Sequence, residues 1–256
     1  MSSVILIRGG GELASGVALR LFRAGLRVVM TELPQPLAIR RLVSFAEAVY
    51  RGQTQVEEVT ACLVENPQHA LERLNHHQIP VLIDPPAKSL EFLRPLVLVD
   101  GRMTKRAPEY GMDVAPLVIG LGPGFNAGIN CHAVVETHRS HYLGRVIWSG
   151  EPLPDSGIPD GVHGRFAERV LRAPCSGIFK PLAEIGASLE PGRIVAEVNG
   201  CPIHAPFKGV LRGILHEGLF VQEGLKVGDL DPRNDPNYCR LVSDKSLAVG
   251  GGALEA

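Results

Sequence analysis

The chain has little of what marks secreted, membrane-bound or nucleic-acid-binding proteins. Its net charge is only −1 over 256 residues, so it lacks the basic excess that broad nucleic-acid binding or attraction to acidic membranes needs. Its cysteines are odd in number and form no C-x-x-C pair, which argues against a zinc or disulfide framework and for a reducing compartment. The five are Cys62, Cys131, Cys175, Cys201 and Cys239.

No segment reads as a membrane span or a secretory leader. Residues 114–135 carry no Asp, Glu, Lys or Arg over 22 positions, but they include four glycines, two prolines and two asparagines. The N-terminus enters an apolar strand at once, without a basic region and a long apolar run, so we expect no signal peptide. These absences predict a cytoplasmic globular protein with no nucleic-acid or membrane partner.

What is present begins with a strand, a glycine turn, a helix and a second strand. Residues 4–7 are apolar and mostly β-branched, residues 13–22 carry an apolar helical face, and residues 28–30 form another apolar run. This order predicts the first βαβ unit of a doubly wound fold.

The glycine turn of this unit carries a chemical signal. Gly9, Gly11 and Ala14 match the G-x-G-x-x-G/A pattern of dinucleotide-binding turns, and Glu32 follows about twenty residues later. The helix N-terminus would face a phosphate and Glu32 a ribose diol. A tight turn without a ligand also fits, because a carboxylate at Glu12 would compete with a phosphate for the helix dipole. The candidate ligand-binding residues here are Gly9, Gly10, Gly11, Glu12 and Glu32.

Cations follow two of the predicted strands. Buried runs end in Asp84 and Asp100, and ligands of open α/β sheets bind at the carboxyl ends of the strands. Arg102, Lys105 and Arg106 follow the second run, where they could bind a phosphate or carboxylate or simply balance local acids. Two arginines after the second strand of the chain could likewise meet a phosphate or form a solvated face: Arg40 and Arg41.

A glycine-rich loop and a polar cluster lie between residues 120 and 145. The loop includes Gly122 and Gly124, and successive backbone amides in such a loop can form an anion-binding nest. The cluster reads as a strand pair around a polar turn, with candidate residues His132, Glu136 and Arg139. They could line the site of an organic ligand, bind a metal or form a salt-bridged hairpin. Their spacing fits no known zinc signature, so we expect no metal.

The second half of the chain contains an internal repeat. Ala173-Pro174-x-x-Gly177 recurs as Ala205-Pro206-x-x-Gly209, and the offset that carries Ala173 onto Ala205 relates the flanking segments without gaps. Two interlocking halves of short β runs predict a small β-sandwich of the biotinyl/lipoyl type. The hairpin between the halves has no lysine, so we expect no covalent biotin or lipoate. Cys201 near its tip could be a thiol carrier or a plain small apolar residue.

The predicted fold class is α/β with a second, all-β domain. We expect a Rossmann-like, mostly parallel sheet domain over residues 1–150 and a linker over 151–169. A biotinyl/lipoyl-like barrel-sandwich hybrid would occupy 170–235, and a C-terminal tail 236–256, of which residues 249–256 would be flexible.

Long motifs resemble one family. R-G-G-G-E-L-A-S-G at 8–16, M-T-E-L-P-Q-P-L-A-I-R-R at 30–41, G-L-G-P-G-F-N-A-G at 120–128 and the A-P repeat are similar to the YqeB-like family. These are accessory proteins of the selenium-dependent molybdenum hydroxylase system. The resemblance implies a cytoplasmic maturation factor for xanthine-dehydrogenase-type hydroxylases. Its partner would be such a hydroxylase or a cofactor-biosynthesis protein.

Three functions remain open on the sequence. The first is a maturation factor that binds a small phosphorylated ligand, such as a nucleotide, NAD(P) or a molybdopterin-type compound. The second is an NAD(P)-dependent oxidoreductase, for which Glu32 favours NAD, although no catalytic pair is evident. The third is a protein interaction module without a ligand.

Overall fold

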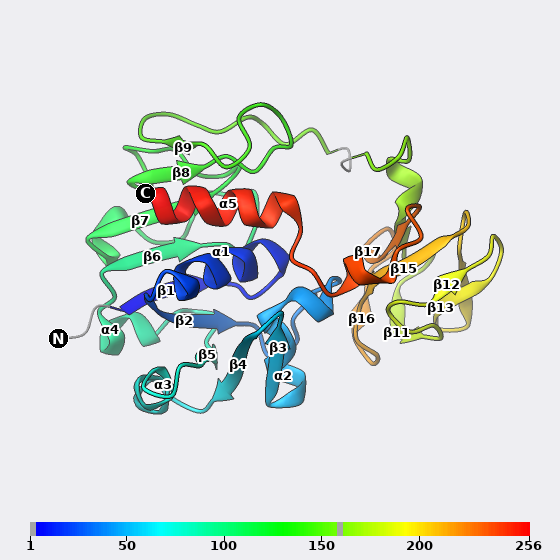
Figure 1. The fold of residues 1–256 in the computed structure, drawn as a ribbon, viewed down its shortest axis with the longest axis horizontal. Coiled ribbons are helices and arrows are strands. Elements are labelled where there is room, and N and C mark those ends of the chain that lie inside the picture. The colour runs from blue at the N-terminus through cyan, green and yellow to red at the C-terminus, as the bar shows by residue number, and fades with distance from the viewer. Residues whose placement is uncertain (1–3, 158–160) are drawn as a thin grey trace. The chain divides into compact units, whose positions relative to one another are not determined.

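The computed structural model describes residues 4–157 and 161–256, and they form two compact units. The first unit contains residues 1–36, 44–156 and 242–256, and the second contains residues 37–43 and 157–241. The chain thus enters the second unit twice and returns to the first at its C-terminal end (Figure 1). We describe each unit by itself. No described helix has the length and apolar character that crossing a membrane requires.

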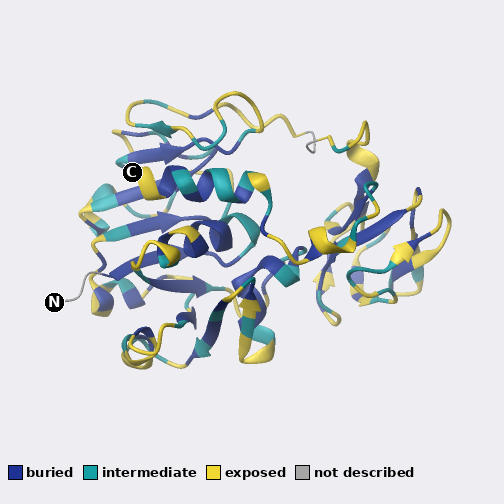
Figure 2. Ribbon diagram, in the orientation of Figure 1, coloured by how far each residue is buried: buried dark blue, intermediate teal, exposed yellow. Residues whose placement is uncertain are grey.

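The first unit is built on a nine-stranded sheet in the order β3-β4-β5-β2-β1-β6-β7-β8-β9. Its strands are β1 (Val4–Arg8), β2 (Arg27–Glu32), β3 (Gln53–Val56), β4 (Val59–Val64), β5 (Ile79–Ile83), β6 (Val97–Asp100), β7 (Leu117–Leu121), β8 (Ala133–Val135) and β9 (Val146–Ile147). The two edge strands, β3 and β9, run antiparallel to their neighbours, and the other adjacent pairs run parallel. The central strands are almost wholly buried (Figure 2), as their continuous apolar runs require.

Helices cover this sheet. They are α1 (Glu12–Arg23), α2 (Ala48–Arg51), α3 (Pro67–Leu74), α4 (Ser89–Leu93) and α5 (Asp244–Glu255). Leu6 and Val29 pack in one cluster with Leu74 of α3 and Leu93 of α4. Because neighbouring residues of a strand face opposite sides, the intervening Ile5 and Ile7 point to the other face. Short 3₁₀ turns occur at Arg41–Val43, Phe45–Glu47, Met112–Val114, Ala167–Arg169 and Pro236–Cys239.

Helix α5 lies alongside α1, where the sequence led us to expect a flexible tail (Figure 1). A Cβ atom at Gly250 would lie 2.6 Å from the Gly16 carbonyl oxygen, and one at Gly16 would lie 2.7 Å from Ser246 Cβ. A Cβ at Gly252 would overlap the carbonyl oxygen of Gly144. The glycines that led us to expect a flexible tail therefore allow α5 to pack closely against α1 and the Gly144 backbone.

The second unit has two four-stranded antiparallel sheets, ordered β10-β17-β15-β12 and β14-β13-β11-β16. Their strands are β10 (Val170–Arg172), β11 (Gly177–Pro181), β12 (Ser188–Leu189), β13 (Ile194–Val198), β14 (Cys201–His204), β15 (Gly209–Ile214), β16 (Phe220–Val221) and β17 (Lys226–Asp231). The offset of the sequence repeat maps β11 onto β15, β12 onto β16 and β13 onto β17, each on the other sheet. The sequence repeat is therefore a structural repeat whose halves exchange strands.

The fold class predicted from the sequence needs correction, although the α/β class of the first unit holds. The large sheet is mixed, and the expected biotinyl/lipoyl barrel-sandwich is wrong, because the second unit consists of two antiparallel sheets. It also includes residues 37–43, and Ile214 donates its backbone N–H to the Ile39 carbonyl at 2.9 Å. The repeat could not reveal this, since periodicity does not show which distant segments pack against the repeated strands.

Candidate functional site

The candidate site lies where the strand order of the large sheet reverses, between β1 and β6. Both strands run parallel and end in charged residues, and Arg8 is the register partner of Asp100. In open α/β sheets, ligands bind at the carboxyl ends of the strands at such a reversal point. The Gly9–Gly11 turn follows β1 directly, so the structure places the predicted turn at the position that binds ligands in such sheets.

The structure explains two of the three glycines of this turn, each by a different constraint. Gly9 has φ +92°, which disfavours any other residue. Gly10 lacks space, because a Cβ there would lie 2.8 Å from the backbone nitrogen of Ala46. Gly11 has φ −67°, and a Cβ there would have no heavy atom within 4 Å. Neither its backbone conformation nor its surroundings within the chain require glycine at position 11.

Glu32 is bound to the same turn. Its carboxylate accepts hydrogen bonds from the backbone N–H groups of Gly10 at 2.6 Å and Leu33 at 2.7 Å. Burial raises the pKa of the Glu32 carboxyl, although both hydrogen bonds oppose this effect. The structure thus brings together two predicted site residues, but Glu32 contacts the turn itself. Glu12 is the first residue of α1, beside the turn.

A charged network borders the turn, and the sequence points to two of its members, Asp100 and Arg102, but not to Arg8 or Glu109. Arg8 is only 2% exposed, and its guanidinium donates to Glu109 Oε1 at 2.5 Å and to the Pro85 carbonyl at 2.7 Å. Arg102 also binds the Glu109 carboxylate, with two contacts of 2.9 Å, and its hydrogen bonds lower the pKa of Glu109 to about 2. A signal was present in the sequence: a charged residue ends an apolar strand immediately before the glycines.

Asp100 anchors the same network from β6. Its carboxylate accepts from the Arg102 guanidinium at 2.6 Å and from the Tyr110 hydroxyl at 2.8 Å. Burial, followed by the neighbouring Asp100 charge, raises the pKa of the Tyr110 phenol. Tyr110 is therefore held as a hydrogen-bond donor and is unsuited to act as a general base.

Lys105 and the loop glycines contact other segments of the chain. Lys105 pairs with Asp155 at 2.6 Å. A Cβ at Gly124 would lie 2.5 Å from the carbonyl oxygen of Arg106, and one at Gly122 would overlap the Thr137 hydroxyl. This loop is rich in glycine because other segments pack closely on it, so its composition is explained without an anion.

The polar cluster after β7 is also engaged internally. His132 Nδ1 accepts the Val118 backbone N–H at 2.9 Å, and the buried Glu136 carboxylate accepts those of His138 and Leu153, each at 2.7 Å. Arg139 forms a two-contact ion pair with Asp244 of α5, at 2.7 Å each. Within residues 4–157 and 161–256, no group of three or more His, Cys, Asp or Glu side chains could hold a metal ion.

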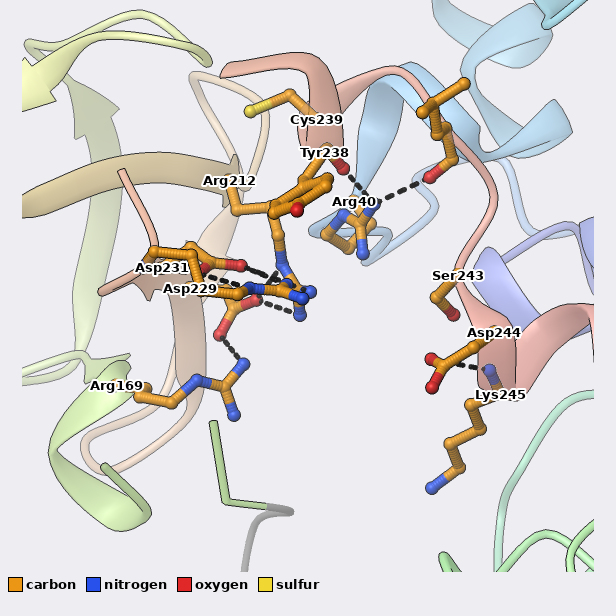
Figure 3. A network of polar contacts seen from close by, with 12 residues as sticks. Arg40, Arg169, Arg212, Asp229, Asp231, Tyr238, Cys239, Ser243, Asp244 and Lys245 are labelled. Atoms are coloured by element: carbon orange, nitrogen blue, oxygen red, sulfur yellow. Dashed lines mark hydrogen bonds and ion pairs between the residues drawn. The ribbon is translucent and has the colours of Figure 1, made fainter. Parts of the chain in front are cut away.

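Arg40 and Arg41 lie in residues 37–43, the first segment of the second unit, and bind this segment to the rest of that unit. Arg40 is buried and donates to the carbonyls of Tyr238 at 2.9 Å and Leu241 at 3.3 Å (Figure 3). Arg41 donates to the Ile214 carbonyl at 2.8 Å. The sequence left a phosphate contact or a solvated face open for these arginines, and the structure instead shows both of them bound to backbone carbonyls of the second unit.

These features define an α/β protein with a glycine turn at the reversal point of its sheet. The chain is similar to the uncharacterized protein YqeB of Escherichia coli K12, with 44% identity over 253 residues, and this supports the resemblance to the YqeB-like family. The match covers 99% of this chain and 47% of YqeB, so the chain spans about half the length of this curated relative. No protein-family model matches the chain.

Solved structures resemble the chain only weakly. An aspartoacylase family protein from Mesorhizobium loti has 15% identity and a TM-score of 0.28, covering 90% of this chain and 85% of that one. A succinylglutamate desuccinylase/aspartoacylase from Rhodobacter sphaeroides has 14% identity and a TM-score of 0.26, with coverages of 90% and 85%. Scores this low carry no argument about fold or function.

Proposed function

We propose that this chain binds a small phosphorylated ligand at the Gly9–Gly11 turn and acts as an accessory factor in the maturation of molybdenum hydroxylases. One observation carries the binding proposal. Gly11 is glycine although its φ of −67° is ordinary and a Cβ there would meet nothing within 4 Å. A close approach by a ligand would account for a glycine that the chain itself does not require.

The surroundings of Gly11 suit an anion. The first hydrogen bond of α1 runs from the Ser15 N–H to the Gly11 carbonyl at 2.8 Å, so Gly11 lies at the N-terminus of the helix, where the backbone amides point along the helix axis towards the turn. These amides and the helix dipole favour a negative charge. By binding the Gly10 amide, Glu32 fixes the shape of the turn and leaves the Gly11 side of it for the phosphate.

The biological role in this proposal rests on the family resemblance and not on the geometry. The relationship to YqeB supports kinship with that family. Assignment to hydroxylase maturation, to a cytoplasmic location and to a hydroxylase partner follows from what the resemblance implies. Co-purification of the chain with a xanthine-dehydrogenase-type hydroxylase, compared with an unrelated flavoenzyme, tests this part separately.

A Gly11→Ser variant tests the ligand site. The serine side chain fills the space beside the turn and can cap α1, so we expect unchanged or slightly higher thermal stability, by a few tenths of a kcal/mol. Calorimetric titration with ATP, NAD⁺ and NADP⁺ should show binding of at least one probe by the native chain and a loss of about tenfold or more in the variant.

Gly251→Ala is the matched control. Gly251 lies in α5, and a Cβ there also meets nothing within 4 Å, so this variant should bind the probes like the native chain. Equal affinities in the native chain and in Gly11→Ser would show that the ligand binds elsewhere. Binding of NAD⁺ with substrate turnover would favour the oxidoreductase alternative.

A further inference from the structure

Two of the five cysteines lie side by side in the second unit. Cys175 precedes β11, and Cys201 is the first residue of β14; both are partly exposed, whereas the other three are buried. Cys175 Sγ lies 3.3 Å from the Val198 carbonyl oxygen, and Val198 is the cross-strand partner of Cys201. The Cys201 side chain lies close enough to raise the pKa of the Cys175 thiol.

The backbone around the pair is held firmly. Ile178 donates its N–H to Asn199 Oδ1 at 3.0 Å, and a Cβ at Gly177 would overlap the Asn199 side chain. The turn that carries Cys175 is therefore packed on the hairpin that ends at Cys201. Two neighbouring thiols on a fixed scaffold can be joined by a disulfide with little backbone movement.

The internal repeat provides a comparison within the same molecule. At the offset that carries Ala173 onto Ala205, Cys175 corresponds to Phe207, and Arg169 corresponds to Cys201. Both Phe207 and Arg169 are buried. In the other half of the repeat the fold therefore holds a phenyl ring where Cys175 stands and a guanidinium where Cys201 stands. The repeated architecture does not itself require a thiol at either position. A chemical role for the pair accounts for this difference.

We propose that Cys175 and Cys201 form a redox-active dithiol that is oxidised to a disulfide by exchange with a low-molecular-weight disulfide such as oxidised glutathione. One protein thiolate attacks a glutathione sulfur, forms a mixed disulfide and releases one glutathione thiolate. The second protein thiolate attacks the protein sulfur of that mixed disulfide and releases the second glutathione. Two protein thiols are oxidised, one disulfide is reduced to two thiols, and no other reactant is consumed.

The environment assigns an order to the two attacks. Cys175 donates its S–H to the Val198 carbonyl at 3.3 Å, and the adjacent Cys201 side chain, followed by burial, raises the pKa of the Cys175 thiol. Cys175 therefore keeps its proton in this hydrogen bond, and the first attack falls to Cys201. Cys62, Cys131 and Cys239 are unsuited to this reaction, because burial raises the pKa of each thiol, that of Cys131 to about 11.

Intact-mass measurement of the full chain in glutathione redox buffers tests the proposal. Oxidised glutathione should remove about 2 Da, and excess reduced glutathione should restore the original mass. Peptide mapping without reduction should place the bond between Cys175 and Cys201. A link to any other cysteine, two stable glutathione adducts, or no reaction under native conditions would overturn the proposal.

Single variants test the order of attack. Cys175→Ser should trap one glutathione on Cys201, and should do so faster than Cys201→Ser traps it on Cys175. Cys62→Ser is the control and should still lose about 2 Da like the native chain. If both single variants fold, as judged by their circular dichroism spectra, and neither traps glutathione, the pair is not reactive and the assignment is wrong.

Discussion

Glu109→Gln should weaken the first unit through the buried Arg8. Glu109 is the carboxylate partner of a guanidinium that is only 2% exposed, so the variant leaves Arg8 with the Pro85 carbonyl and a neutral amide. Hydrogen bonds from Arg102, and then from Arg8, lower the Glu109 pKa from an ordinary 4.5 to about 2, which would correspond to about 3 kcal/mol if fully realised. Because the Glu109 side chain is 58% exposed, solvent screening reduces the expected loss to about 1.5 kcal/mol.

The stabilisation by Glu109 should depend on pH in a defined direction. The folded pKa of Glu109 lies below the ordinary value, so the stabilisation is fully present above pH 4.5 and is lost as the pH falls towards 2. The amide of Glu109→Gln does not titrate in this range. The difference in unfolding free energy between the native chain and the variant should therefore be largest at neutral pH and vanish near pH 2.

Urea unfolding followed by tryptophan fluorescence measures this difference. The single tryptophan, Trp148, belongs to the first unit, as Glu109 does, so its signal reports the relevant part of the chain. Glu65→Gln is the control: its side chain is 88% exposed, so we expect less than about 0.5 kcal/mol. A Glu109→Gln difference that is absent at pH 7, or that persists unchanged at low pH, would refute the stabilisation assigned to the contacts of Glu109 with Arg8 and Arg102.

Three further outcomes follow from the packing. Gly250→Ala should cost about 2 kcal/mol or more in thermal unfolding, because its Cβ would meet the Gly16 carbonyl at 2.6 Å. Gly251→Ala on the same helix should instead stabilise it by up to about 1 kcal/mol, and equal melting temperatures for the two variants would contradict the close packing of α5 on α1. Asp229→Asn should cost about 3 kcal/mol in the second unit, since the buried carboxylate holds Arg169 at 2.9 Å and Arg212 at 2.6 Å (Figure 3); a melting temperature within a degree of the native value would rule this out.

The parts of the fold that the sequence reveals are those with a local period. The apolar runs around Gly9–Gly11 predict β1, α1 and β2, and the internal repeat predicts paired strands in the second unit. Helix α5 escapes this reasoning, because Gly250 and Gly252 lower local helix propensity and the partner that stabilises the helix lies more than two hundred residues away in sequence.

In the candidate site, too, the sequence reveals some residues and contacts and not others. Glu32 is predicted from its spacing after the glycine turn to face a ribose diol, whereas in the structure its carboxylate accepts the Gly10 backbone N–H at 2.6 Å. The Arg8–Glu109 pair joins residues 101 positions apart, and such a pairing has no signature in local sequence. His132 and Glu136 are predicted as members of a polar cluster that could line a ligand site, but their partners in the structure are backbone N–H groups, which no side-chain pattern shows.

The glycine-rich loop around Gly122 and Gly124 shows why a high glycine content alone is a poor guide to a ligand site. A glycine-rich loop indicates that something approaches the backbone closely, and at Gly122 and Gly124 this is true, but the approaching atoms belong to Thr137 and Arg106 of the same chain. Gly9 is explained by its positive φ and Gly10 by the adjacent Ala46 backbone. Of the five glycines predicted to bind a ligand, Gly11 alone has neither explanation, so the structure reduces a broad glycine signal to one position at the N-terminus of α1.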